Sequence, residues 1–155
     1  TSIGFHFFFK CTSLKHITIP SSVVSIGVGS FNGCSSLSKI TFEDPCHIES
    51  IGDNAFQGCE SLISFEIPSS VTFIGEGIFD NCSSLSKITF GTPCHIESIG
   101  NHVFQGCKSL VSFEIPSSVT SIGEGTFNNC SSLSQVTFGT SCHIESIGDN
   151  VFAGC

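Results

Sequence analysis

Apolar side chains recur along the chain in fixed columns with a short period. Ile-Gly occurs seven times, and the gaps between copies alternate between 23 and 25 residues. A Phe follows five residues after each Ile, and a Cys follows three residues after each Phe. Such columns are the signature of a solenoid, in which each coil packs only on its neighbours. The pattern predicts a repeat solenoid of seven coils spanning residues 1–155.

Each coil contains a segment that alternates apolar and polar residues. Ile40 and Phe42 point to one face of this segment, and Lys39 and Thr41 point to the other, as expected for a short strand. In-register stacking of the equivalent segments predicts one parallel sheet on one face of the solenoid. The predicted strands span residues 14–19, 37–42, 62–67, 85–90, 110–115 and 133–138.

The rest of each coil is predicted to form the opposite face of the solenoid. A turn follows the strand, either Pro20-Ser21-Ser22 or a version two residues longer at 43–47. The two versions alternate and define a superrepeat of 48 residues. A second short extended segment then leads to Ile-Gly. Phe31 and Cys34 lie three residues apart, which predicts a single helical or 3₁₀ turn across residues 28–34.

The outward side of the predicted sheet is the candidate ligand-binding surface. Along it the charges alternate in sign at Lys39, Glu66, Lys87 and Glu114. This arrangement suits a solvated face that neutralises itself, since opposite charges on neighbouring strands help a sheet. It equally suits a concave binding surface of the kind that solenoids use. The two outward rows are His16, Lys39, Ser64, Lys87, Ser112 and Gln135, then Thr18, Thr41, Glu66, Thr89, Glu114 and Thr137.

Three Phe residues break their columns and are candidate contact residues. Phe73 stands before the fourth Ile-Gly, where the six other coils have Ser. Phe5 and Phe9 occupy columns that elsewhere hold mostly Asp, Glu or Asn. Because they are four residues apart on one turn, Phe5 and Phe9 predict an apolar patch at the end of the array.

Composition narrows the classes of partner. The chain has 5 Lys+Arg against 13 Asp+Glu, for a net charge of −8, which argues against nucleic acid because a phosphate-binding surface needs clustered basic residues. The sequence contains no apolar run of about 18 residues, so it predicts no membrane span. No feature of the repeat calls for a cofactor.

The ten Cys fall into two groups. Seven form one column between Phe and Leu columns, where small buried thiols packing as free hydrophobes are favoured over disulfides. The other three precede His, at Cys46-His47, Cys94-His95 and Cys142-His143. These pairs lie two coils apart, about 10 Å, so they cannot share one zinc ion. Duplication of a turn accounts for them better than metal binding or catalysis does.

The pattern L-x-x-I-x-I-P-S-S-V-x-x-I-G-x-x-x-F-x-x-C, as in Leu62 to Cys82, resembles the BspA-like class of leucine-rich repeats. The resemblance covers the whole chain. It implies a curved right-handed solenoid and a non-enzymatic role in adhesion or recognition, binding protein or extracellular-matrix ligands from the cell surface or after secretion. Neither end shows a cap, so we expect a stretch of a longer protein, or alternatively units that assemble into filaments.

Overall fold

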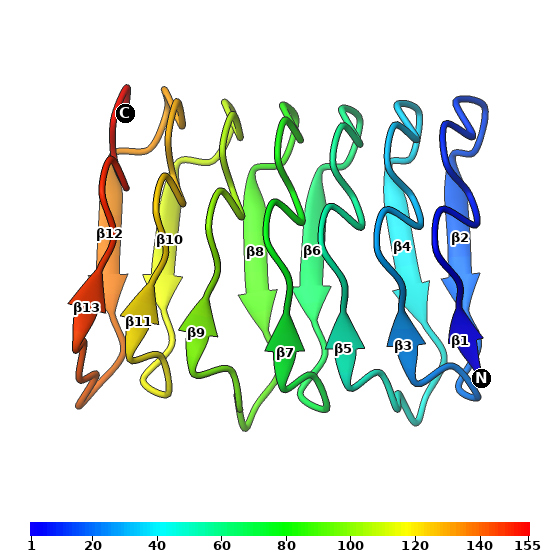
Figure 1. Ribbon diagram of the computed structural model, residues 1–155, viewed down its shortest axis with the longest axis horizontal. Coiled ribbons are helices and arrows are strands. Elements are labelled where there is room, and N and C mark those ends of the chain that lie inside the picture. Colours follow the sequence, from blue (N-terminus) through cyan, green and yellow to red (C-terminus); the bar gives the residue numbers. More distant parts are fainter.

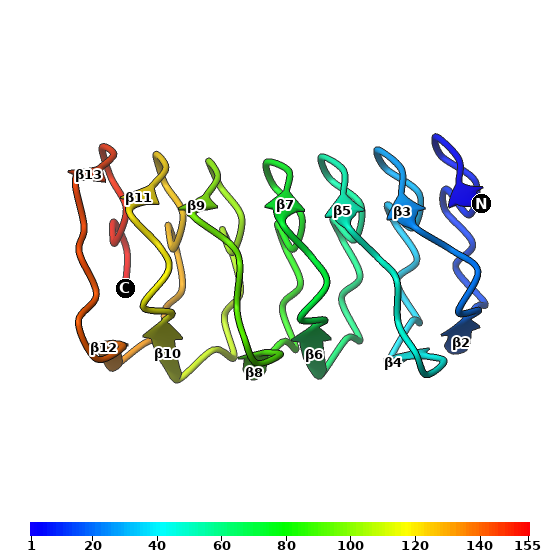
Figure 2. The same ribbon diagram turned by 90° about the horizontal axis from the view of Figure 1, so that it is seen from below.

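Two kinds of short parallel strand alternate along the chain. The computed structural model describes residues 1–155, and its coils stack side by side into an elongated solenoid of about six turns (Figure 1). Two-residue strands form one face, the short-strand face, and four-residue strands form the other, the long-strand face (Figure 2). Every strand pair is parallel, so the prediction of a parallel solenoid is confirmed.

The strand bounds follow the columns of the sequence. The short strands are β1 (Ser2–Ile3), β3 (Ser25–Ile26), β5 (Ser50–Ile51), β7 (Phe73–Ile74), β9 (Ser98–Ile99), β11 (Ser121–Ile122) and β13 (Ser146–Ile147). The long strands are β2 (His16–Ile19), β4 (Lys39–Phe42), β6 (Ser64–Ile67), β8 (Lys87–Phe90), β10 (Ser112–Ile115) and β12 (Gln135–Phe138). There are six long strands for the seven predicted coils.

The prediction of one continuous sheet is wrong. The long strands pair only two by two, as β2 with β4, β6 with β8, and β10 with β12. The short strands form a four-stranded sheet, β1-β3-β5-β7, and a three-stranded sheet, β9-β11-β13. We call the contact between one coil and the next a joint. The long-strand ladder is therefore interrupted at alternate joints, and the short-strand ladder is interrupted once, between β7 and β9.

The prediction of a helical or 3₁₀ turn is also wrong. The segment from Ile-Gly to Cys, which we call the turn edge, contains successive turns and no helix. In one coil the N–H of Asn32 donates to the Gly29 carbonyl and that of Cys34 to the Phe31 carbonyl. Gly29 and Gly33 have φ of 61° and 75°, a left-handed conformation that an α-helix cannot accommodate. Because two residues of each such segment are left-handed, the chain forms consecutive tight turns here instead of a helix.

The core is a set of stacked columns. Thirty-three buried apolar residues form one cluster that runs through the whole array. Seven Phe rings, one after each Ile-Gly, stack face to face with centroid separations between 4.9 and 5.7 Å. Five of them are fully buried, as the columns predicted: Phe31, Phe56, Phe79, Phe104 and Phe127. Burial of these rings drives the coils together, because each ring contacts the ring before and the ring after it.

The fold has no helix of the length and apolarity that crossing a bilayer requires.

Candidate ligand-binding face

The residues of the two predicted outward rows lie on the long-strand face. Those of the first row are all exposed, and they are in register across the paired strands, with His16 opposite Lys39 and Ser64 opposite Lys87. In the second row, the hydroxyls of Thr18 and Thr41 lie 2.9 Å apart and share a hydrogen bond. The structure thus places the residues of both rows on one surface, the long-strand face, but it divides that surface into strand pairs.

Two hollows occupy the interrupted joints of this face. The first, of about 740 Å³, lies where β4 and β6 do not pair, and Thr41, Phe42 and Glu66 contribute to its lining. The second, of about 620 Å³, lies between β8 and β10 and is lined by residues 48 positions later. The identical residues that the two hollows share are Ile40/Ile88, Thr41/Thr89, Phe42/Phe90, Pro45/Pro93, Cys46/Cys94, Glu66/Glu114, Pro68/Pro116, Ser69/Ser117, Gly91/Gly139 and Thr92/Thr140.

A proline explains why the ladder stops at these joints. Where strands pair, the residue after the later strand donates its N–H to the coil before it, as from Gly91 to the Ile67 carbonyl at 2.8 Å. At the β4–β6 joint the equivalent residue is Pro68, which has no N–H. The carbonyl of Phe42 therefore lacks that donor, and Pro116 has the same effect one superrepeat later.

An aromatic ring accompanies each interruption. The second residue of β6 is Phe65, where β4 and β8 have Ile40 and Ile88. Its buried ring lies 5.1 Å from that of Phe56 and meets the ring of Phe42 edge-on at 5.8 Å, across the interrupted joint. Phe113 repeats this arrangement in β10. At these joints the aromatic rings pack together in the core, while the strands at the surface form no ladder hydrogen bonds.

The chemistry of the hollows is that of an acceptor site. Each combines a carboxylate, a Thr hydroxyl and a half-buried Phe ring, and no Lys lines either one. Such a lining suits a group that donates hydrogen bonds and also has apolar surface, as protein side chains do.

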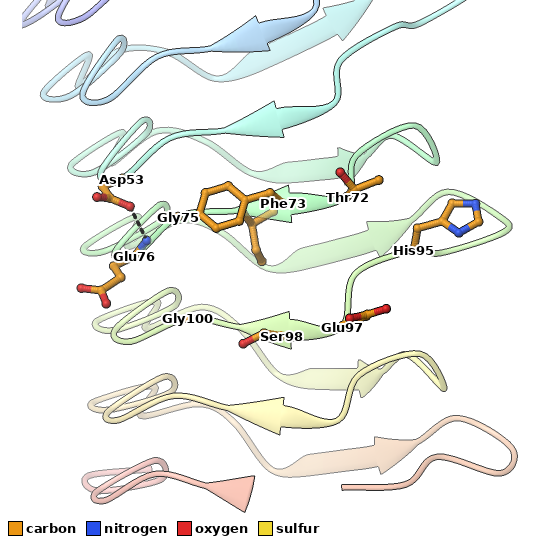
Figure 3. Close-up of a pocket in the computed structure, with 10 residues that line it drawn as sticks. Asp53, Thr72, Phe73, Gly75, Glu76, His95, Glu97, Ser98 and Gly100 are labelled. Atoms are coloured by element: carbon orange, nitrogen blue, oxygen red, sulfur yellow. Dashed lines mark hydrogen bonds between the residues drawn. The ribbon is translucent and has the colours of Figure 1, made fainter. Parts of the chain in front are cut away.

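Phe73 lies on the opposite side of the molecule. Its ring is 58% exposed at the end of the sheet that β7 closes (Figure 3). Beside it is a hollow of about 740 Å³ that Glu97 and Ser98 help to line. The sequence marked Phe73 as unusual, but it did not predict the hollow or the interrupted ladder. Phe5 and Phe9 are also exposed, and both stack on the His6 ring between them, at 3.9 and 4.7 Å.

Comparison with known proteins identifies the repeat. Six copies of the BspA type leucine rich repeat region match the chain over residues 1–95 and 90–155. The chain belongs to the BspA-type leucine-rich repeat family. The solenoid of a leucine-rich repeat protein from T. pallidum is similar, with a TM-score of 0.89 and 31% identity over 100% of this chain and 70% of that one.

Two further solved structures extend the comparison. The pneumococcal vaccine antigen PcpA is 32% identical, with a TM-score of 0.77 over 82% of this chain and 31% of its own. A leucine rich cell surface protein from Faecalibacterium prausnitzii is 30% identical, with a TM-score of 0.64 over 98% of this chain and 48% of its own. The BspA-type array thus spans less than half of these two proteins. No curated protein sequence matches it significantly.

Leucine-rich repeat arrays of this type are protein-interaction scaffolds and are typically not catalytic. In this BspA-type array the buried Cys column is structural. The Cys82 thiol donates to the Phe56 carbonyl of the preceding coil, and five other thiols of the column donate to the corresponding carbonyl. Burial raises the pKa of Cys130 to about 12 and that of Cys82 well above its usual value. Since the thiolate is the reactive form, these buried thiols are poor nucleophiles.

The Cys-His pairs do not assemble into a site. Cys46, Cys94 and Cys142 are half-buried in the turns of alternate coils. The Nδ1 atom of His47 lies 3.0 Å from the Ser21 carbonyl oxygen, within hydrogen-bond distance. No group of three or more His, Cys, Asp or Glu side chains is arranged to hold a metal ion. All ten cysteines are free thiols.

Proposed function

We propose that this chain is the recognition module of a cell-surface or secreted protein, and that it binds a protein ligand of the extracellular matrix or of a host cell surface. Membership of the BspA-type family supports this proposal, as does similarity to a bacterial cell surface protein. Binding takes place on the long-strand face, and it involves no covalent chemistry.

The observation that carries the proposal is the repetition of the hollow. Glu66 and Glu114 occupy equivalent positions in two hollows that are one superrepeat apart, and both are exposed. Each hollow offers a carboxylate beside a partly exposed aromatic ring. A protein ligand that places a donor in each hollow gains two charge-assisted contacts and buries Phe42 and Phe90 at the same time.

Binding to a panel of purified extracellular-matrix proteins tests the proposal. The wild-type chain should bind at least one of them saturably in surface plasmon resonance. The double variant Glu66→Gln/Glu114→Gln keeps the shape of both side chains and removes their charge. We expect it to bind at least about tenfold more weakly, since two charge-assisted hydrogen bonds lose strength.

A matched control lies on the short-strand side. Glu49 and Glu145 are also exposed, and neither lines one of the two hollows. The double variant Glu49→Gln/Glu145→Gln therefore changes the net charge by the same amount. It should leave affinity within about twofold, because exposed charges far from a contact are screened. Equal loss in both double variants would indicate a general charge effect and would contradict the assignment of the binding face. Absence of binding to every matrix protein would contradict adhesion.

A further inference from the structure

The short-strand face has one defect in an otherwise regular ladder. At an intact joint such as β9–β11, Gly123 donates its N–H to the Ile99 carbonyl at 2.8 Å, and Thr120 donates to the Glu97 carbonyl at 2.8 Å. The same two bonds recur at the other paired joints of this face. The hydroxyl of Ser121 also donates to that of Ser98, at 2.9 Å.

Both backbone bonds are missing between β7 and β9. Gly100 does not donate to Ile74, and Glu97 does not donate to Thr72, although the sequence provides an N–H at both positions. The carbonyls of Thr72 and Ile74 therefore accept no ladder bond from the N–H groups of Glu97 and Gly100, which flank β9. The 25-residue spacing is not the cause, because the equally spaced joints β3–β5 and β11–β13 are paired.

The glycine that follows each short strand provides an independent measure of this joint. A Cβ at Gly27, Gly52 or Gly123 would lie within 2.7 Å of an atom of the preceding coil. A Cβ at Gly100 would meet nothing nearer than 3.3 Å, at the Gly75 carbonyl oxygen. The coils are therefore farther apart at this joint, as Figure 3 also shows for β7 and β9.

Phe73 marks the opening. It replaces the Ser of the other coils, so the hydroxyl contact of the Ser column is lost here, and its exposed ring lies beside β7, at the edge of the four-stranded sheet (Figure 3). The hollow beside it is open to solvent, and its lining includes Thr72, Ile74 and Glu97. Asp53 and Glu76 extend the lining toward the turn edge.

The charge of this face is one-sided. Two columns of acids border the short strands, and no Lys lies between them. Lys15, Lys39 and Lys87 lie in or beside the long strands, and the remaining two adjoin the Cys column. The acids of the two columns are Glu49, Glu97 and Glu145, then Asp53, Glu76, Glu124 and Asp149. An approaching cation is therefore attracted to this face around β7 and β9.

We propose that the open joint between β7 and β9 is a docking point for an arginine side chain of a partner protein. A planar guanidinium stacks on the exposed Phe73 ring and has five donors in a fixed fork. It can therefore contact the ring, the free carbonyls of Thr72 and Ile74, and the Glu97 carboxylate, which has no hydrogen bond within the chain. All five Lys+Arg residues in this 155-residue stretch are Lys, so a second copy of the stretch itself offers no arginine.

Peptide titration followed by amide NMR tests this assignment on the 155-residue chain. The probes are three Gly/Ser heptapeptides that differ only at the central residue, which is Arg, Lys or citrulline. We expect the Arg peptide to shift the Glu97 and Gly100 amides saturably while the Gly123 amide stays unchanged. The Lys peptide should bind several-fold more weakly, and the uncharged citrulline peptide should give no saturable shift.

Two variants separate the parts of the site. Phe73→Ser restores the residue of the other coils and is expected to fold, and it should weaken the Arg peptide at least about fivefold. Glu97→Gln should weaken it as well, while Glu145→Gln, at the equivalent position of an intact joint, should not. Equal binding of Arg and citrulline peptides, equal shifts at Gly123, or no shift in the wild type would overturn the proposal. Concentration-dependent shifts without peptide would instead assign the joint to self-association. None of these outcomes depends on the long-strand face.

Discussion

The turn edge and the long-strand face belong to the same coils, yet their hydrogen bonding differs. Along the turn edge, three backbone hydrogen bonds cross every joint, as from Phe31 to Ala55 and from Phe79 to Val103. Along the long-strand face, ladders cross only alternate joints. On the turn edge the outer two of the three donors at each joint are left-handed residues, such as Gly29 and Gly33 on either side of Phe31. On the long-strand face the residue in the donor position at the open joints is Pro68 or Pro116, which has no N–H. A repeat thus keeps its core columns while one face of it is opened by single residues.

The largest expected effect comes from the columns beneath both regions. Phe79 is fully buried between Phe56 and Phe104, so Phe79→Ala leaves a cavity and should lower the free energy of unfolding by about 3–5 kcal/mol. Phe73→Ala removes an exposed ring and should cost less than about 1 kcal/mol. Urea unfolding of both variants measures the difference. Similar losses would mean that the column does not carry the stability of the joint.

The second largest effect is expected from alkaline pH, which should lower the free energy of unfolding through the buried Cys column of the turn edge. Burial raises the pKa of Cys59, Cys82, Cys107 and Cys130 above the ordinary value of 9.0, so these thiols keep their protons when folded. Above pH 9 the unfolded chain releases protons that the folded chain retains. The free energy of unfolding should therefore fall by about 1.4 kcal/mol per pH unit for each such thiol, and this contribution is intact below pH 9.

Urea unfolding at a series of pH values measures this slope. In the variant Cys130→Ala, the free energy of unfolding should fall less steeply with pH, by the contribution of one thiol, about 1.4 kcal/mol per pH unit. A stability that stays constant from pH 8 to about pH 10.5 would contradict burial of the column, since each unfolded thiol ionises across this range.

Glycine substitutions compare an intact joint with the open one. A Cβ at Gly123 would lie 2.6 Å from the Asn101 backbone nitrogen, so Gly123→Ala should cost about 1–3 kcal/mol by overpacking. Gly100→Ala meets a looser contact of 3.3 Å and should cost less than Gly123→Ala does. Thermal unfolding ranks the two variants. The reverse order would show that the coils at β7 and β9 are packed as closely as elsewhere.

The smallest expected effect is a difference in amide exchange within the unmodified chain. The Gly123 amide is bonded to the Ile99 carbonyl, whereas the Gly100 amide has no backbone acceptor. In native-state hydrogen exchange, Gly100 should exchange much faster than Gly123, because exchange of a bonded amide requires local opening. Comparable protection of the two amides would indicate that the ladder continues through this joint.

Most of the fold could be predicted because the columns are repeated. The positions of Phe31, Cys34 and their equivalents give the period, and Ile40 with Phe42 gives the inward side of the long strands. The outward rows followed directly from the same alternation. The BspA-type resemblance then agreed with the period along the whole chain, since the repeat and the family pattern share the same columns.

The interruptions could be predicted only in part. Pro68 was visible as a missing donor and Phe65 as a bulkier residue, but how far a joint opens depends on the packing of Phe42 and Phe56 against that ring. The turn edge was mistaken for a helical turn because Phe31 and Cys34 are three apart. Gly29, Gly33 and their Asn counterparts at 54 and 81 were the signal against helix, since all four are left-handed. The open joint at Phe73 involves no proline, so its only sign in the sequence is the Phe that replaces the Ser of the other coils.

The alternation of closed and open joints bears on how such an array changes length. A deletion or duplication of 48 residues returns the same coil types to the same neighbours, so every joint keeps its type. Loss of the coil that contains β8 would place the coils of Pro68 and Pro116 in contact, with two open joints in succession. Loss of the coil that contains Pro68 would abolish the first hollow. Recombination between copies therefore preserves the pattern of hollows only in whole superrepeats, and the pair of coils is the heritable unit of this protein.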